Sequence, residues 1–202
     1  MEVLKRLVPT FKRSIKCPYP MTPEVYVVHN TYNDASAINE IAYMTNNDRQ
    51  VSFHYAIDDK QIVQGIEENR NAWHAGDGAT GKGNRKGIGV EICYSKSGGA
   101  RFIGAERLAA KFIAKGLTDK KWPIDRVTKH QDYSGKYCPH RTLDLGWARF
   151  IKMIEREMEP EHVKILRAKT SSPQAWIDFV EANRNHPTGK WLPDLIVKLN
   201  QK

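Results

Sequence analysis

Two short apolar segments without strict polar alternation stand out along the chain. Residues 25–28 read Val-Tyr-Val-Val and lead into His29, and residues 88–93 contain a single charged residue, Glu91. Short runs of this kind, rich in β-branched residues, predict strands that are buried on both faces, as in a sheet covered by helices.

Residues 51–64 follow another pattern. Two β-rich stretches, 53–57 and 61–64, flank the polar triplet Asp58-Asp59-Lys60, which predicts a hairpin. The Gly-rich stretch at 73–87 that follows is too long for a simple connection, which suggests a functional loop. Its glycines neither follow a strand nor open a helix, so a nucleotide-binding loop is disfavoured.

Apolar residues at intervals of three and four predict three helices in the same part of the chain. They lie near 34–46, with Asp34 as the N-cap, near 104–117, and near 147–158, where Pro160 interrupts the pattern. Strands that alternate with helices predict a layered α/β fold.

The C-terminal part of the chain has a helical pattern of its own. Ser172-Pro173 is typical of a helix start, and Pro193 opens a last short helix that runs to Leu199. A pair of helices this small cannot hold a core alone, so we expect it to pack on the main domain or on another copy. The sequence therefore predicts a domain at 1–160 and a small helical appendage at 161–202.

Composition adds a charge signal to this picture. The 202 residues are 40% hydrophobic and 27% charged, and the formal net charge is +9. This excess indicates a polyanionic partner such as nucleic acid, acidic lipid or an anionic cell-wall polymer, unless the surface is basic only for solubility. Three cysteines without CxxC spacing argue against a disulfide scaffold.

No targeting or spanning segment is evident. The first nine residues lack the apolar run of a signal peptide, and no stretch approaches the ~18 apolar residues of a membrane span. We therefore expect no stable membrane insertion and a protein that begins in the cytoplasm.

Side chains that could bind a metal ion or take part in catalysis are most concentrated at residues 129–140. His130, Lys136 and Cys138 lie within nine residues, on a segment whose Ser134-Gly135 pair favours a loop. Imidazole and thiolate are ligands that zinc prefers, and His29, at the end of a buried strand, offers a third. Two histidines and one cysteine leave one tetrahedral position for water, which is the layout of a catalytic zinc site.

Two further residues fit hydrolysis at such a site. Glu91 lies in an apolar strand, where a carboxylate must be paired, neutral or facing a cleft. It is either a salt-bridged structural residue or the base that takes a proton from the attacking water. Lys136 is either a solvated loop lysine or the ammonium that stabilises the oxyanion of an attacked amide.

The arrangement of these motifs resembles one family. The matching pieces, which run in family order across about residues 20–155, are Val28-His29-Asn30-Thr31, Ser52-Phe53-His54-Tyr55, Trp73-His74-Ala75-Gly76, Ile88-Gly89-Val90-Glu91-Ile92, His130-Gln131 and Lys136-Tyr137-Cys138-Pro139. The chain is similar to the zinc-dependent type-2 N-acetylmuramoyl-L-alanine amidases, which include phage endolysins, bacterial autolysins and peptidoglycan recognition proteins.

The resemblance implies a central mixed β-sheet flanked by helices and one Zn²⁺ ion held by His29, His130 and Cys138. It also implies that Glu91 and Lys136 are catalytic and that the enzyme cleaves the amide between N-acetylmuramic acid and L-alanine. Some relatives carry a catalytic tyrosine where this chain has Phe53, so that role cannot be transferred.

For the remaining aromatic residues we expect Trp73 and His74 to line the substrate groove. His54 is expected behind the ligand residues, and His140, His162 and His186 receive no role. The expected partners are peptidoglycan and anionic wall polymers, and residues 161–202 provide either a wall-binding element or a homo-oligomer contact.

The family also suggests a phage or prophage endolysin that stays cytoplasmic until the membrane is breached. Three alternatives remain. A non-catalytic peptidoglycan-binding module would typically have lost a zinc ligand, whereas Cys138 is present. A thiol hydrolase using Cys138 and His130 would need a free thiolate. A nucleic-acid-binding protein is motivated by charge alone, and we expect no nucleic-acid partner.

Overall fold

The structure is a computed structural model that describes residues 1–187 and 189–201. The chain divides into two compact units, Met1–Glu157 and Met158–Lys202, which are described separately. No helix within the described ranges is both long enough and apolar enough to cross a membrane.

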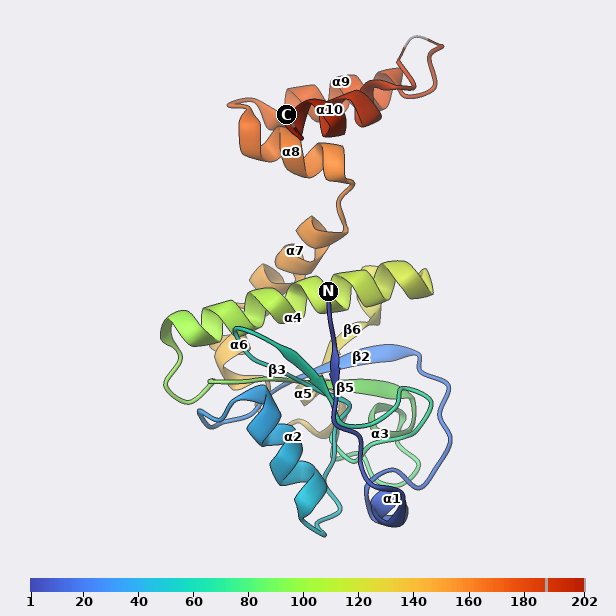
Figure 1. Ribbon diagram of the computed structural model, residues 1–202, viewed down its shortest axis with the longest axis vertical. Coiled ribbons are helices and arrows are strands. Elements are labelled where there is room, and N and C mark those ends of the chain that lie inside the picture. The colour runs from blue at the N-terminus through green and yellow to red at the C-terminus, as the bar shows by residue number, and fades with distance from the viewer. Residues whose placement is uncertain (188, 202) are drawn as a thin grey trace. The chain divides into compact units, whose positions relative to one another are not determined.

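The first unit is built on a six-stranded sheet with the order β1-β4-β3-β5-β2-β6 (Figure 1). The strands are β1 (Leu4–Lys5), β2 (Val25–Asn30), β3 (Tyr55–Ile57), β4 (Ile62–Gln64), β5 (Gly87–Ile92) and β6 (Val127–Lys129). Only the β3–β4 pair is antiparallel, and it forms the expected hairpin. The sheet is therefore mixed, which confirms the predicted fold class.

Helices cover both faces of this sheet. The helices of the first unit are α1 (Arg13–Lys16), α2 (Ala37–Asn46), α3 (Lys82–Lys86), α4 (Gly99–Lys120), α5 (Gln131–Ser134), α6 (His140–Asp144) and α7 (Trp147–Met158), with 3₁₀ turns η1 (Thr10–Lys12) and η2 (Ile124–Arg126). Helix α4 packs on β3 and β5 from one side, and α2 contacts β3 and β4 from the other (Figure 1).

The start of α2 differs from the expectation. The helix begins at Ala37, and Asp34 is not its cap. The Asp34 carboxylate instead accepts hydrogen bonds from the backbone and the hydroxyl of Ser97. The Ala37 amide donates to Asp58, 21 residues away in the hairpin turn. A tertiary contact thus replaces the local cap that the sequence suggested.

The loop expected around Ser134-Gly135 is partly helical. Residues 131–134 form the single turn α5, and Gly135 ends it with a φ of 74°. A glycine in the left-handed region is a common way to terminate a helix, so the Ser-Gly pair marks the end of a helix here.

The side chains of β2 alternate between the two faces of the sheet. Tyr26 points towards α4, where its ring packs against Phe112 and Trp122. His29, three residues further on, therefore faces the opposite side. Its partner across the parallel pair with β5 is Glu91, so the imidazole and the carboxylate emerge on the same face.

The second unit is a three-helix arrangement of α8 (Glu161–Lys169), α9 (Pro173–Asn183) and α10 (Leu192–Asn200). Its buried cluster consists of Val163, Leu166, Ile177 and Val180, with Leu192 and Ile196 packed against it. The two helices that the sequence predicted here thus pack against α8, which we had not expected as their support.

Candidate metal centre

The candidate site lies at the carboxyl ends of three neighbouring parallel strands. His29 is the next-to-last residue of β2, and Glu91 is its counterpart in β5. His130 directly follows β6, whose Lys129 pairs with Val28 of β2. The carboxyl edge of parallel strands is where α/β proteins commonly build their sites, because the chain turns there and side chains converge.

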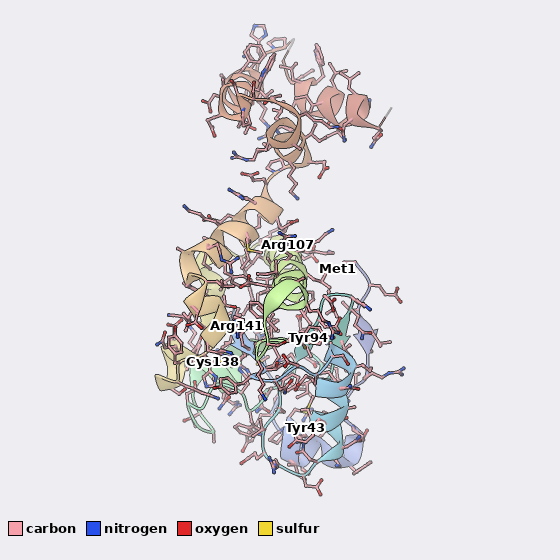
Figure 2. All side chains as sticks on the ribbon, turned by 90° about the vertical axis from the view of Figure 1, so that its left-hand side faces the viewer. Met1, Tyr43, Tyr94, Arg107, Cys138 and Arg141 are labelled. Atoms are coloured by element: carbon pink, nitrogen blue, oxygen red, sulfur yellow. The ribbon has the colours of Figure 1, made fainter. Side chains whose placement is uncertain are left out.

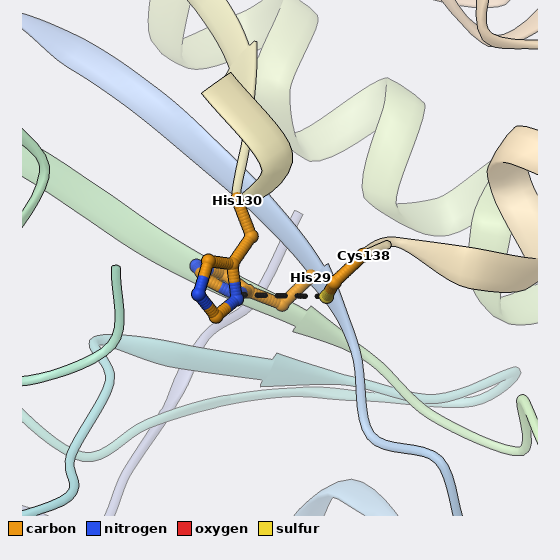
Figure 3. A group of neighbouring side chains, drawn as sticks. All are labelled: His29, His130 and Cys138. Carbon is orange, nitrogen blue, oxygen red and sulfur yellow. Dashed lines mark hydrogen bonds between the residues drawn. The ribbon is translucent and has the colours of Figure 1, made fainter. Parts of the chain in front are cut away.

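Three side chains converge at this edge (Figure 3). The Nδ1 atoms of His29 and His130 are 3.0 Å apart, and Sγ of Cys138 is 3.9 Å from Nδ1 of His29. One ligand atom from each residue lies within 4.8 Å of the other two. All three side chains are buried. These are the three candidate ligands expected from the sequence. They are up to 109 positions apart in the chain, and the fold brings them together.

Cys138 is held in place by the end of β2. The backbone amide of Asn30 donates a hydrogen bond to its sulfur, and burial raises the pKa of the thiol to about 12. The Asn30 side-chain oxygen also accepts the amides of Arg141 and Thr142 at 3.0 and 3.2 Å. Figure 2 shows Cys138 and Arg141 close together on this stretch. Asn30 therefore fixes both the thiol and the start of α6.

The imidazoles of the site are neutral at physiological pH. Burial lowers the pKa of His29 well below its ordinary value, with further lowering by His74 and His130. Burial lowers the pKa of His130 to about 4, and Lys136 acts in the same direction. A neutral imidazole is the form that binds a metal ion, so the donor set fits a zinc ion.

Glu91 has an unsatisfied oxygen. Its Oε2 atom is buried and has no hydrogen-bond partner in the described part of the chain. The pKa of the carboxyl is raised to about 8, first by burial and then by the charge of Glu40, while Lys136 opposes the shift. An unpaired buried carboxyl oxygen costs free energy, which is typical of a functional group awaiting a ligand or substrate.

Lys136 lies at the exposed side of the cluster. It lines a pocket of about 310 Å³ together with Tyr32, Tyr137, Cys138 and other residues. Its positive charge lowers the pKa values of His29 and His130. The ammonium is therefore close enough to the three-residue cluster to act on a group bound there.

A larger pocket of about 510 Å³ is lined mainly by α2 and by the segment before β3. Its walls include Thr31, two residues beyond His29, and Tyr43, which is labelled in Figure 2. Phe53 also lines it and offers no hydrogen-bonding group there. Glu40, another wall residue, acts electrostatically on Glu91.

Trp73 and His74, the two residues expected to line the substrate groove, both make contacts inside the protein. The Trp73 ring donates to the Ile15 carbonyl at 2.9 Å and packs edge-on against Tyr19. The His74 ring is buried, and its nitrogens lie 3.0 Å from Nε2 of His29 and 3.2 Å from the carbonyl of Gly87. Trp73 thus anchors the N-terminal segment while its substrate contact stays a prediction. His74 lies behind His29.

Sequence reasoning missed two residues that support the site. Asn30 directly follows His29, so its position next to a candidate ligand was the available signal. Asn84 lies in the Gly-rich stretch, and its side-chain oxygen accepts the amides of His74 and Ala75, both at 2.8 Å. Nothing in the local sequence marks Asn84, because its partners are defined only by the folded loop.

The α/β sheet thus brings two imidazoles and a thiol together at its carboxyl edge, with no fourth candidate ligand in this group among the described residues, and these three side chains could hold a metal ion. A family model described as N-acetylmuramoyl-L-alanine amidase matches residues 19–141. The chain belongs to this family, which confirms the resemblance drawn from its motifs.

Individual relatives of known name agree with this family assignment. The chain is 57% identical over 176 residues to N-acetylmuramoyl-L-alanine amidase CwlA of Bacillus subtilis (strain 168), covering 87% of this chain and 63% of that protein. It is 56% identical over 157 residues to the amidase XlyB of the same organism, covering 77% and 50%. The chain therefore spans only about half to under two thirds of these relatives.

Among solved structures, that of PlyL superimposes with a TM-score of 0.74 at 53% identity. The match covers 76% of this chain and 97% of the chain in that structure. The likeness thus includes nearly the whole of that neighbour.

Proposed function

We propose that the chain is a zinc-dependent amidase that cleaves the bond between N-acetylmuramic acid and L-alanine in bacterial peptidoglycan. The observation that carries the proposal is the convergence of His29, His130 and Cys138 within 4.8 Å of one another in a member of this family. In this proposal the three residues hold one Zn²⁺ ion.

The donor set supports the assignment of zinc. Two imidazole nitrogens and a sulfur are the borderline-soft ligands that zinc prefers. The Asn30 amide that donates to Cys138 stabilises the thiolate form needed for binding. Three protein ligands leave a coordination position free for a substrate or a water molecule.

When bound, zinc supplies a water molecule of lowered pKa and an electrophile for the substrate carbonyl. Glu91 is the proposed proton carrier: in its ionised form, which becomes dominant above its raised pKa of about 8, the carboxylate accepts a proton from the attacking water and returns it to the leaving nitrogen of L-alanine. The support for this role is the free, buried Oε2 atom and the register that puts Glu91 beside His29.

Lys136 is the proposed stabiliser of the oxyanion. As water adds to the amide carbon, negative charge develops on the carbonyl oxygen, and a nearby ammonium lowers the energy of that state. The support is its position on the pocket that also contains Cys138 and its electrostatic influence on both candidate imidazole ligands.

Digestion of purified peptidoglycan with product analysis tests the reaction. We expect new alanine amino termini and no new reducing sugars, with activity abolished by a chelator and restored by zinc. New reducing ends would indicate a glycosidase. Tight binding to walls without any product would instead indicate a non-catalytic peptidoglycan-binding module.

A chelator and an alkylating agent distinguish a thiol hydrolase from a zinc amidase. A hydrolase that used Cys138 as its nucleophile would survive chelation and lose activity on alkylation. The zinc amidase shows loss on chelation, and bound zinc protects Cys138 from the alkylating agent.

We further propose that the second unit contributes to wall binding. Its helix α9 exposes 52% of Trp176 and 51% of Phe179, and residues 161–202 carry seven Lys or Arg against four Asp or Glu. Exposed aromatic rings suit sugar rings, and a segment with net positive charge suits anionic wall polymers.

The test is a pull-down of the 202-residue chain carrying Glu91→Ala with purified walls, with and without Trp176→Ala and Phe179→Ala. We expect weaker retention for the double replacement. The matched control replaces Phe11, which is 76% exposed in the first unit, and should leave retention unchanged. If the replacement instead lowers the molecular mass in sedimentation, the surface is a homo-oligomer contact. Retention by DNA that falls steeply with salt would indicate a nucleic-acid partner.

The proposed setting is a phage or prophage lysis system, in which the enzyme stays in the cytoplasm until the membrane is breached. Cell fractionation before and after membrane permeabilisation tests this, because the protein should move from the cytosolic to the wall fraction only afterwards.

A further inference from the structure

The two proposed imidazole ligands each have one ring nitrogen turned away from the cluster. In His29, Nδ1 faces the cluster and Nε2 lies 3.0 Å from Nδ1 of His74. The other nitrogen of His74, Nε2, lies 3.2 Å from the carbonyl oxygen of Gly87. A continuous line of contacts thus joins the backbone of β5 to the ring that would hold the metal.

The chemistry of this line allows one arrangement of protons. The Gly87 carbonyl only accepts, so His74 must carry its proton on Nε2. Its Nδ1 is then an acceptor, which requires a proton on Nε2 of His29. Nδ1 of His29 is left with a free lone pair directed at the cluster. All of this holds for neutral rings, and burial lowers the pKa of His74 to about 3.

His130 is fixed in the same way by the next residue. Its Nδ1 faces His29, and the Ala75 carbonyl accepts a hydrogen bond from the ring. Because Nδ1 is turned to the cluster, Nε2 makes this bond and carries the proton. The dipeptide His74-Ala75 therefore holds both imidazoles, one through a side chain and one through a backbone carbonyl.

The dipeptide itself is rigidly held. Asn84 accepts the backbone amides of both residues, and the Asn84 amide and Gly83 amide donate to the Asp77 carboxylate. On the other side, the His74 ring lies where a side chain on Gly89 would be, since an added Cβ would come within 2.8 Å of it. The sheet thus leaves a place for this ring only because residue 89 is glycine.

We propose that His74 is a positioning residue of the metal centre, which presets His29 in the Nε2–H form and so raises the affinity for zinc. The inference rests on the proposed zinc site. It replaces the expectation that His74 lines the substrate groove. Partners of this kind orient a metal-bound imidazole and typically change metal affinity about 10–100-fold when removed.

Long-range ¹H–¹⁵N spectra of the zinc-free, full-length protein test the arrangement without any substitution. We expect His29, His74 and His130 each to be neutral at pH 7 with the proton on Nε2. A His29 ring that carries its proton on Nδ1 would overturn the proposal.

Zinc affinity, measured by competition with a chromogenic chelator, gives the second test. His74→Phe keeps a buried ring but removes the acceptor, so we expect zinc to bind about 10–100-fold more weakly. His74→Asn retains an acceptor near the position of Nδ1 and should recover part of the affinity. In His74→Phe the His29 signals should also change to a mixture of the two tautomers.

His54→Phe is the matched control. His54 is also a buried imidazole, and its ring centroid is 5.9 Å from that of His74. Its ring accepts the Gly89 amide and donates to the Arg70 carbonyl, so it touches no proposed ligand. We expect a lower melting temperature with little change in zinc affinity.

The outcomes separate the two proposals. If the unmodified protein does not bind zinc, the proposed metal centre fails. If it binds zinc and His74→Phe binds equally well, or if His54→Phe weakens binding as much as His74→Phe, the positioning role fails while the metal centre stands. If His74→Phe does not fold, His74→Asn and the spectra of the unmodified protein decide.

Discussion

The two units of this chain differ in how many polar side chains they bury. The first unit encloses several neighbouring imidazoles, among them His29, His54 and His74, each with at least one ring nitrogen hydrogen-bonded to another protein group. The second unit buries four aliphatic side chains and one imidazole, that of His162, which lies 3.4 Å from the Glu181 carboxylate, and it leaves Trp176 and Phe179 about half exposed.

The difference follows from size. Burying a polar group costs free energy unless it is fully hydrogen-bonded, and a connected buried network can be maintained only where a large apolar core surrounds it. The six-stranded sheet and its helices supply that core, whereas three short helices have little stability to spare. The buried polar side chains that could take part in a reaction are therefore concentrated in the first unit. The second unit contributes mainly its surface residues.

The largest effect should come from the buried carboxyl. Glu91→Ala removes the proposed proton carrier but no metal ligand, so we expect zinc content to be kept and kcat to fall about 10²–10⁴-fold. Digestion rates and metal analysis on the same preparation measure both. Digestion at the parental rate would remove Glu91 from the reaction, and loss of zinc would indicate a structural role instead.

Replacing the thiol tests the ligand set. Cys138→Ser should weaken zinc binding and lower the melting temperature together, because a metal that binds only the folded state adds about 4 kcal/mol at a thousand-fold excess over its Kd. Calorimetry with and without zinc measures the shift. Cys93→Ser is the control, since Cys93 is also buried but is not in the cluster.

A smaller effect is expected from Asn84→Ala. This change leaves the amides of His74 and Ala75 without their acceptor, which should cost about 1–3 kcal/mol of stability. Zinc affinity should fall by less than in His74→Phe, because the imidazole itself remains. Chelator competition and chemical denaturation measure the two quantities. Unchanged stability would mean that water replaces the lost acceptor.

In the second unit, Leu166→Ala should cost about 2 kcal/mol, the low end for a buried leucine, because the side chain is slightly exposed. Hydrogen exchange in α8–α10 should accelerate while the first unit is unaffected. Zinc affinity should not change. A decrease in zinc affinity would show that the two units are coupled.

The sequence predicted much of this protein because its strongest signals are local. Residues 25–28 are apolar and residues 88–93 are apolar except for Glu91, and the two runs coincide with strands β2 and β5. The candidate ligands were recognisable by residue type and by the family motifs around them. Their convergence follows from parallel pairing, which brings strand ends to one edge.

The features that the sequence did not reveal depend on distant partners. The cap of α2 comes from Asp58 rather than Asp34, and no local pattern distinguishes the two. The position of His74 behind His29 depends on the path of a Gly-rich segment held by Asn84. The stability of the C-terminal helices depends on α8, whose weak apolar pattern did not suggest a packing surface.

Asn30 sets an order in which the candidate site can be completed. Its side-chain oxygen accepts the backbone amide of Thr142, 112 positions later, and its own backbone N–H reaches the sulfur of Cys138. A nascent chain on the ribosome that has not yet emerged past α6 lacks this pair of contacts. The three candidate ligands can therefore meet only after the whole sheet and α6 have left the ribosome, and any shorter chain is without the proposed metal centre.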